Sequence, residues 1–138
     1  MAIDTKVIQS NPNEFTPKPL TAKAFAPFGD VIEVDDNKQH FAINDGNTER
    51  YHDLADIDVG TGKAIVSIFR STPLPQPISL RMMERHPLGS QAFVSMTGLP
   101  YLVVVAPAGE FDASKMEVFI AQGNQGVNYH TGTWHHYC

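Results

Sequence analysis

Short apolar or alternating runs, separated by clusters of Gly, Asn, Asp and Pro, recur along most of the chain. Turn residues of this kind interrupt the sequence at 45–47, 60–62 and 123–124. Short strands bounded by such turns are typical of a sandwich or a small barrel. The runs that we interpret as strands are 31–34, 41–43, 64–70, 78–82, 92–96, 101–106 and 116–121. The sequence therefore predicts a mostly β fold.

The N-terminal part has a different pattern. Residues 1–19 show no hydrophobic period and contain three prolines. We expect this segment to be a flexible or loosely docked arm, followed by one domain over residues 20–138. Thr21 stands before several good helix formers and Pro27 follows them, which predicts a short capped helix at the start of the domain.

The charge of the chain limits its partners. Ten Lys plus Arg against fifteen Asp plus Glu leave a net charge of -5, without a basic run. We therefore expect neither nucleic acid nor a membrane surface as a partner. The longest apolar run, 101–106, is far shorter than the about 20 residues of a membrane helix. The chain begins without a signal-peptide pattern, and its single cysteine, Cys138, cannot form an intrachain disulfide, so we expect a cytoplasmic protein.

The first group of candidate site residues lies in the middle of the chain. Glu84 and His86 are two positions apart, so on a strand they point to the same face. A turn at 87–89 would bring Gln91 back on the neighbouring strand. With Gly98, these residues keep the spacing of the first cupin motif, although two of its ligand types are changed.

A second group of histidines, His130, His135 and His136, lies within seven residues near the C-terminus. Gly132 and His135 fit the Gly-x-x-His of the second cupin motif, so His135 is expected to approach His86. Imidazole nitrogens together with side-chain oxygens suit a divalent ion such as Zn, Ni, Fe or Mn. The expected metal ligands are Glu84, His86, Gln91 and His135.

Structural roles for several of these residue types stay open. Isolated histidines such as His40 and His52 are more often hydrogen-bonded structural residues than ligands, and His136 could be structural or exposed. Glu84 could pair with a neighbouring arginine. Trp134 could belong to the core or to a cavity wall.

Two segments, 84–93 (ERHPLGSQAF) and 126–136 (GVNYHTGTWHH), resemble signatures of the ureidoglycolate lyase family of the cupin superfamily. Further similar segments are 28–33 (FGDVIE), 43–46 (INDG), 50–54 (RYHDL) and 65–70 (IVSIFR). The resemblance implies a cupin-like jelly-roll β-barrel, usually a homodimer. It also implies cleavage of (S)-ureidoglycolate to glyoxylate and urea in allantoin and purine degradation, with a divalent metal that is nickel in this family.

This chain differs from similar chains of the family in one respect. Similar chains continue past the His135–His136 pair through further strand sequence, so we expect a barrel that is incomplete at the C-terminus. An open edge of this kind needs a cover, which the arm at 1–19 or a partner subunit could supply. The alternative is a shortened chain that is inactive.

The chemistry implied for the substrate calls for an acid, a base and a cation. Release of urea removes a proton from the hydroxyl group and delivers one to the departing nitrogen. His130 and Tyr129 are the expected proton carriers, with His86 as a further catalytic residue. An acidic substrate also favours a bidentate arginine contact, for which Arg70 is the first choice. The expected substrate-binding residues are Arg70, Arg50, Arg85 and Trp134.

Two other functions fit the same pattern. A non-catalytic cupin that binds a small acidic molecule is favoured by the changed first-motif ligand and by the neutral Gln91. Another metal-dependent cupin enzyme, such as an isomerase or a dioxygenase, is the second alternative. A dioxygenase normally has a stronger iron site of three histidines, or of two histidines and a carboxylate.

Overall fold

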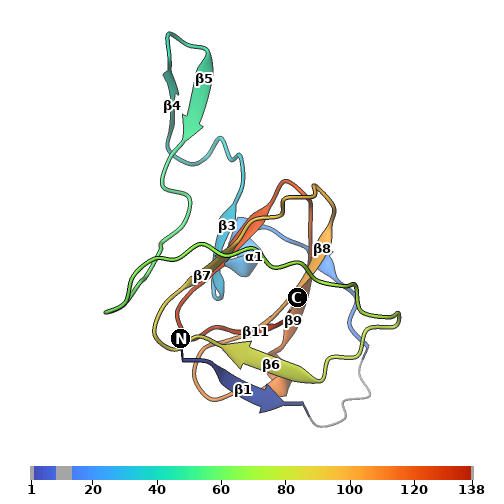
Figure 1. The fold of residues 1–138 in the computed structure, drawn as a ribbon. Helices are drawn as coiled ribbons and strands as arrows, with labels where there is room; N and C mark the ends of the chain where they lie inside the picture. The colour runs from blue at the N-terminus through green and yellow to red at the C-terminus, as the bar shows by residue number, and fades with distance from the viewer. Residues whose placement is uncertain (1, 9–13, 138) are drawn as a thin grey trace.

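A computed structural model describes residues 2–8 and 14–137 of the chain. The strands within these residues form one six-stranded, one three-stranded and one two-stranded sheet, and the helices are limited to α1 (Ala22–Phe25) and the 3-10 turn η1 (Ala113–Lys115). Figure 1 shows the two larger sheets in the body of the molecule and the smallest sheet projecting from it. The mostly β fold predicted from the sequence is confirmed, and it is consistent with a cupin-like architecture. Neither helix in the described ranges has the length and apolar character needed to cross a membrane.

The six-stranded sheet brings together segments that are far apart in the sequence. Its strands, in spatial order, are β1 (Asp4–Val7), β6 (Met82–Arg85), β11 (Trp134–His136), β8 (Tyr101–Ala106), β9 (Glu117–Ala121) and β2 (Lys18–Pro19). All neighbours are antiparallel except β2, which runs parallel to β9. This order places β6 directly beside β11, so the two halves of the expected site are neighbours.

The three-stranded sheet consists of β3 (Gly29–Ile32), β10 (Gly126–Tyr129) and β7 (Gln91–Phe93), with β10 in the centre. Tyr129 lies opposite Gly29 on one side and opposite Gln91 on the other. A Cβ atom at Gly29 would lie 1.9 Å from the carbonyl oxygen of Asn128, so only glycine allows this close pairing.

The main core lies between these two sheets. Side chains alternate along β8, so Val103 and Val105 enter this core while Val104 and Ala106 face the other side of the six-stranded sheet. The buried residues of the main core are Leu20, Phe25, Phe28, Val31, Val103, Val105, Phe119, Ala121, Val127 and Tyr129. Apolar burial on both sides of β8 explains why its sequence is a continuous apolar run.

A second, smaller core covers the outer face of the six-stranded sheet. It contains Met83, Val104, Ala106, Met116, Val118 and Trp134. The indole nitrogen of Trp134 donates a hydrogen bond of 2.9 Å to the carbonyl oxygen of Gly109. Trp134 therefore fills this outer core and satisfies its polar atom there.

Two pieces of the N-terminal segment pair with the six-stranded sheet. β1 runs along β6 and β2 along β9, so the two pieces lie at opposite edges of the six-stranded sheet. Residues 9–13 of the expected arm and the single cysteine Cys138 lie outside the described residues. Thr21 caps α1 as predicted, because its hydroxyl oxygen accepts a hydrogen bond of 3.2 Å from the amide of Ala24.

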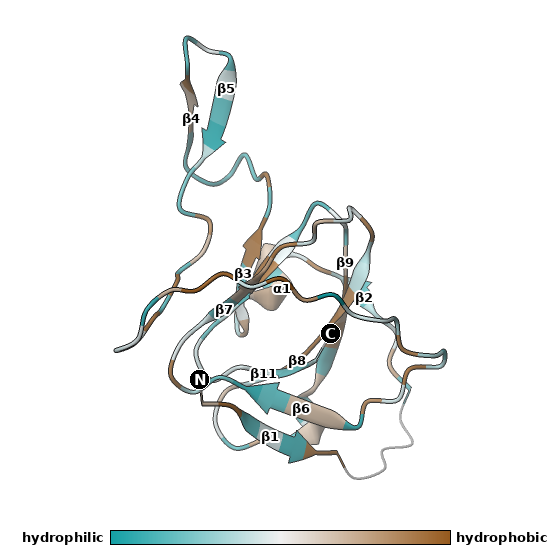
Figure 2. Cartoon of the chain, viewed as in Figure 1, coloured by the Kyte–Doolittle hydropathy of each residue, from teal (hydrophilic) through white to brown (hydrophobic). Residues whose placement is uncertain are grey.

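Two expected strands are wrong. Residues 64–70 form no strand, and Val66 and Ile68 are 98% and 78% exposed. This segment crosses the front of the body, and Figure 2 shows its apolar character. Of residues 78–82, only Met82 belongs to a strand. The apolar composition of 64–70 favours a strand, but no strand in the described part of the chain pairs with it.

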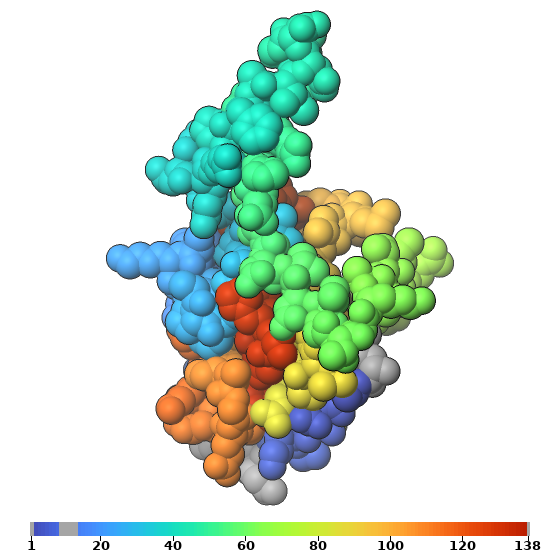
Figure 3. All heavy atoms as spheres, turned by 90° about the vertical axis from the view of Figure 1, so that its left-hand side faces the viewer, coloured from blue at the N-terminus to red at the C-terminus, as the bar shows by residue number. Residues whose placement is uncertain are grey.

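The two-stranded sheet is a hairpin of β4 (His40–Ile43) and β5 (Thr48–Tyr51) that projects from the body (Figures 1 and 3). Its strands pair only with each other within the described residues. His40 hydrogen-bonds Glu49 across the hairpin at 2.6 Å and stacks on Tyr51. The hydrogen bond to Glu49 raises the pKa of His40.

Candidate metal centre

Glu84, His86 and His135 come together between the two larger sheets. Glu84 and His86 share a face because they are two residues apart at the end of β6, and the antiparallel register places His135 of β11 opposite Glu84. Each of the three residues offers one ligand atom, and these atoms all lie within 4.8 Å of one another. The convergence predicted from the spacing of these residues is confirmed.

Aromatic contacts fix the orientation of His135. Its ring stacks on Tyr129 with 4.3 Å between centroids, and on His86 with 5.4 Å between centroids. One carboxylate oxygen of Glu84 lies 3.8 Å from Nδ1 of His135. The ring is thus held by residues from both sheets.

Burial sets the protonation state of this centre. His135 is 1% exposed, and burial lowers its pKa to about 4, with the neighbouring His86 and His136 acting in the same direction. Burial also lowers the pKa of His136. His135 is therefore neutral near pH 7, which is the form of imidazole that binds a metal ion.

Several buried polar atoms at and around the cluster lack a hydrogen-bond partner among the described residues. They are both ring nitrogens of His86, Nε2 of His135 and Oε1 of Gln91. Buried polar atoms in folded proteins are normally satisfied, so a group of orphaned atoms needs an explanation. A nitrogen and oxygen donor set of this kind fits a divalent metal ion.

Gln91 reaches the same face from the other sheet. It lies directly opposite Tyr129 in the antiparallel register, and directly opposed residues project to the same side of a sheet. Because Tyr129 stacks on His135, the side chain of Gln91 projects from the sheet face that is turned toward the three-residue cluster. Its amide oxygen would add a neutral ligand.

His130, one of the two expected proton carriers, lies apart from the cluster. Its Nε2 is 3.2 Å from Oδ2 of Asp30, and Asn128 donates to the same oxygen at 3.0 Å. Asp30 and Asn128 project from the side of the three-stranded sheet that faces away from the core, whereas Tyr129 projects into it. The structure therefore brings Tyr129 to the cluster and leaves His130 on the other side of β10.

Asp30 and Asn128 form a polar network that the sequence patterns did not indicate. The amide of Asp56 also donates to Oδ2 of Asp30, at 2.8 Å. Burial by itself raises the pKa of Asp30, but the hydrogen bonds from Asn128, Asp56 and His130 outweigh it and lower the pKa. The available signal was a polar residue inside each of two otherwise apolar strands, β3 and β10.

Arg85 and Trp134 were expected at the substrate, but they lie on the outer face of the six-stranded sheet. The Arg85 guanidinium stands 4.7 Å from the Trp134 ring centroid and donates to Asp4 at 2.8 Å. Both residues line a hollow of about 710 Å³ with Lys6 and Phe111. Residues two apart share a face, so Arg85 projects to the side opposite Glu84 and His86.

The other two expected arginines also lie outside the cluster. Arg50 belongs to the projecting hairpin, where it stands over Phe41 at 5.6 Å. Arg70 is exposed at the end of the crossing segment. The preceding Phe69 packs on Phe93 with 5.8 Å between ring centroids, so Arg70 lies next to the strand that carries Gln91.

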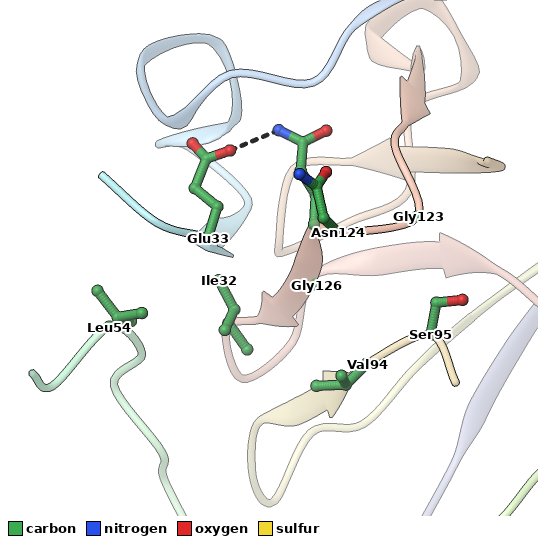
Figure 4. Close-up of a pocket in the computed structure, with 9 residues that line it drawn as sticks. Ile32, Glu33, Leu54, Val94, Ser95, Gly123, Asn124 and Gly126 are labelled. Atoms are coloured by element: carbon green, nitrogen blue, oxygen red, sulfur yellow. Dashed lines mark hydrogen bonds between the residues drawn. The ribbon is translucent and has the colours of Figure 1, made fainter. Parts of the chain in front are cut away.

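A second hollow, of about 300 Å³, lies at the far end of β10 from Tyr129. Figure 4 shows Ile32, Leu54 and Val94 at its wall, together with the hydrogen bond that Glu33 accepts. None of the site residues predicted from the sequence lines it. The candidate chemistry therefore belongs to the cluster around His135.

This fold and this cluster define a class: mostly β proteins with a candidate divalent-metal centre between two sheets. The family model described as ureidoglycolate lyase matches residues 12–138. The chain belongs to the ureidoglycolate lyase family.

Relatives of this chain carry the same name. A protein named ureidoglycolate lyase from Burkholderia mallei is 58% identical over 121 residues, which cover 86% of this chain and 71% of that protein. One from Pseudomonas syringae pv. syringae is 56% identical over 122 residues, covering 86% and 71%. One from Pseudomonas syringae pv. tomato is 54% identical over 124 residues, covering 88% and 72%.

Proposed function

We propose that this chain is a ureidoglycolate lyase, which cleaves (S)-ureidoglycolate to glyoxylate and urea. One observation carries the proposal. Glu84, His86 and His135 converge between the two larger sheets, with ligand atoms within 4.8 Å of one another, in a chain of the ureidoglycolate lyase family.

His86, His135 and Gln91 are the residues that would hold a divalent ion, and Glu84 lies within reach of the same point. Their orphaned nitrogen and oxygen atoms support this assignment. When bound, such an ion supplies Lewis-acid chemistry that lowers the pKa of a substrate hydroxyl. Among the ions that suit this donor set, we propose nickel.

Two side chains that contact His135 can move the protons that the cleavage requires. The carboxylate of Glu84 takes the proton of the substrate hydroxyl, and the oxygen electron pair forms the carbonyl of glyoxylate. The carbon–nitrogen bond breaks, and its electron pair goes to the departing nitrogen. Tyr129, which stacks on His135, gives that nitrogen a proton, and urea leaves.

A cation is needed for the substrate carboxylate, and we assign it to Arg70. Phe69, at the end of the crossing segment, contacts Phe93 of β7, the strand that begins at Gln91, and Arg70 directly follows Phe69. A bidentate guanidinium contact would orient the carboxylate relative to the ion and Glu84.

The wider setting follows from the family resemblance. We propose a homodimer that acts in the cytoplasm on a small acidic substrate, in the degradation of allantoin and purines. Support comes from the family membership.

Glyoxylate release tests the proposed reaction. The purified chain is incubated with (S)-ureidoglycolate after chelation, and then with Ni²⁺ or Mn²⁺ added back. We expect metal-dependent glyoxylate formation that is lost in Glu84→Gln, while this variant still binds the ion. Binding of ureidoglycolate without glyoxylate under any metal would overturn the lyase and favour a non-catalytic binding protein.

A further inference from the structure

Hydrogen bonds tie the exposed residue Asp58 to two turns that border the metal centre. The amide of Asp58 donates to the Ser90 hydroxyl at 2.8 Å, and the Ser90 amide donates to the Asp58 carbonyl oxygen at 2.8 Å. The hydroxyl of Thr131 donates to Oδ2 of Asp58 at 2.8 Å. We call Asp58, Ser90 and Thr131 the Asp58 clasp.

One side of the clasp is the turn between His86 and Gln91. Ser90 directly precedes Gln91, and β6 ends at Arg85, one residue before His86. Residues 86–90 therefore lie outside the strand ladders that align the rest of the site. The clasp holds this turn by the backbone and side-chain bonds of Ser90.

The other side of the clasp is the turn that leads from Tyr129 to His135. Thr131 lies in this turn, and the amide of the next residue, Gly132, donates to the carbonyl oxygen of His86 at 2.9 Å. The turn at 130–133 thus contacts His86 through Gly132 and Asp58 through Thr131. The two turns meet at the clasp.

Asp58 is itself held in place. Its Oδ1 accepts a hydrogen bond of 2.9 Å from the amide of Gly60, and the nearby Asp56 is fixed by Asp30 and Asn128. A Cβ atom at Gly60 would lie 2.4 Å from the Leu88 carbonyl oxygen, so the two backbones are in close contact. The carboxylate is therefore presented to Thr131 in one fixed orientation.

We propose that Asp58 is a positioning residue of the metal centre. It links the turn that carries His86 and Gln91 to the turn before His135, and so sets the spacing of these ligands for a divalent ion. The inference rests on the proposed metal-dependent function. Residues that orient the ligands of a metal change its affinity by about 10- to 100-fold when they are lost.

Cobalt binding to the full chain provides the first test, with Co²⁺ alone as the probe. We expect Asp58→Asn and Thr131→Val each to weaken Co²⁺ binding by about tenfold, and to shift the visible absorption band of the bound ion. The double variant should bind no more weakly than either single variant, because both changes break the same link.

Asp112→Asn is the matched control. Asp112 is an exposed aspartate whose carboxylate also accepts hydrogen bonds from a neighbouring side chain and backbone, at Ser114. It lies beside η1, away from the cluster. We expect this variant to leave the Co²⁺ affinity and the absorption band unchanged.

Amide hydrogen exchange in the metal-free protein tests the Asp58 clasp independently of the proposed reaction. We expect faster exchange at Gly132 and Thr133 in Asp58→Asn and Thr131→Val, and no change there in Asp112→Asn. If the wild-type chain binds no Co²⁺, the metal-dependent function fails, and this exchange alone decides whether the clasp holds the turn. Unchanged exchange, or unchanged Co²⁺ affinity in a chain that binds the ion, would overturn the inference.

Discussion

Tyr129 lies parallel to His135, with 4.3 Å between the ring centroids and 2° between the ring planes. Tyr129 belongs to the three-stranded sheet and His135 to the six-stranded sheet. The contact therefore links the two layers at the metal centre, and the packing of the layers controls the orientation of a ligand ring.

Replacing Tyr129 tests this link. We expect Tyr129→Leu to weaken Co²⁺ binding by about tenfold, because an aliphatic side chain no longer holds the imidazole flat. Tyr129→Phe keeps the flat ring and should bind Co²⁺ like the wild-type chain, although glyoxylate formation should be lost with the hydroxyl proton. Equal Co²⁺ affinity in the leucine and phenylalanine variants would show that the stack does not orient the ligand.

Protonation of His135 should destabilise the metal-free protein in mild acid. Burial lowers its pKa in the folded state to about 4 from a usual value of 6.5, so between these values the unfolded chain binds more protons. Stability is thus fully present above pH 6.5 and is lost as the pH falls toward 4, by roughly 3 kcal/mol. Urea unfolding at several pH values measures this loss. The control is the His135→Gln variant, whose free energy of unfolding should vary less over the same pH range. An identical pH dependence in the two proteins would show that protonation of His135 does not cause the loss of stability.

The neutral amide of Gln91 should limit the affinity of the site for the ion. We expect Gln91→Glu to bind Co²⁺ at least about tenfold more tightly, because a carboxylate is a stronger ligand than an amide. The same change should lower the free energy of unfolding without metal, since it buries an acid. Calorimetric titration with Co²⁺ and urea unfolding give the two quantities. A lower Co²⁺ affinity in Gln91→Glu would place this side chain outside the ligand set.

Arg70 should act on substrate binding more than on turnover. Arg70→Lys keeps the charge but loses the bidentate geometry, so we expect KM to rise about tenfold while kcat changes little. Arg81→Lys is the matched control, because Arg81 is also exposed and lies outside the proposed site. Steady-state assays of glyoxylate release give both constants. An unchanged KM in Arg70→Lys would remove this residue from the site.

Local patterns were sufficient to predict parts of the fold and the centre of the site. The two-residue spacing of Glu84 and His86 directly determines a shared face on a strand, and that face is the one observed. The apolar run at 101–106 forms β8, and Thr21 caps α1. Each of these features depends on a few neighbouring residues.

Features that depend on distant partners were not predictable in the same way. Residues 64–70 have strand composition, but a strand also needs a neighbour to supply hydrogen bonds, and composition does not report one. His130 follows Tyr129 at the end of β10, and the alternation of the strand sends the two side chains to opposite sides. The motif spacing placed both near the site, whereas the pairing of β10 with β3 decides which one faces the cluster.

The register between β6 and β11 carries a consequence for how this site can be altered. A slip by one residue would turn Glu84 and His86 outward together and would bring Met83 and Arg85 into the interior. Such a slip would also take Met83 out of the outer core and would bury a guanidinium against apolar side chains. Natural selection for nothing more than a well-packed sheet therefore also preserves the alignment of the metal ligands.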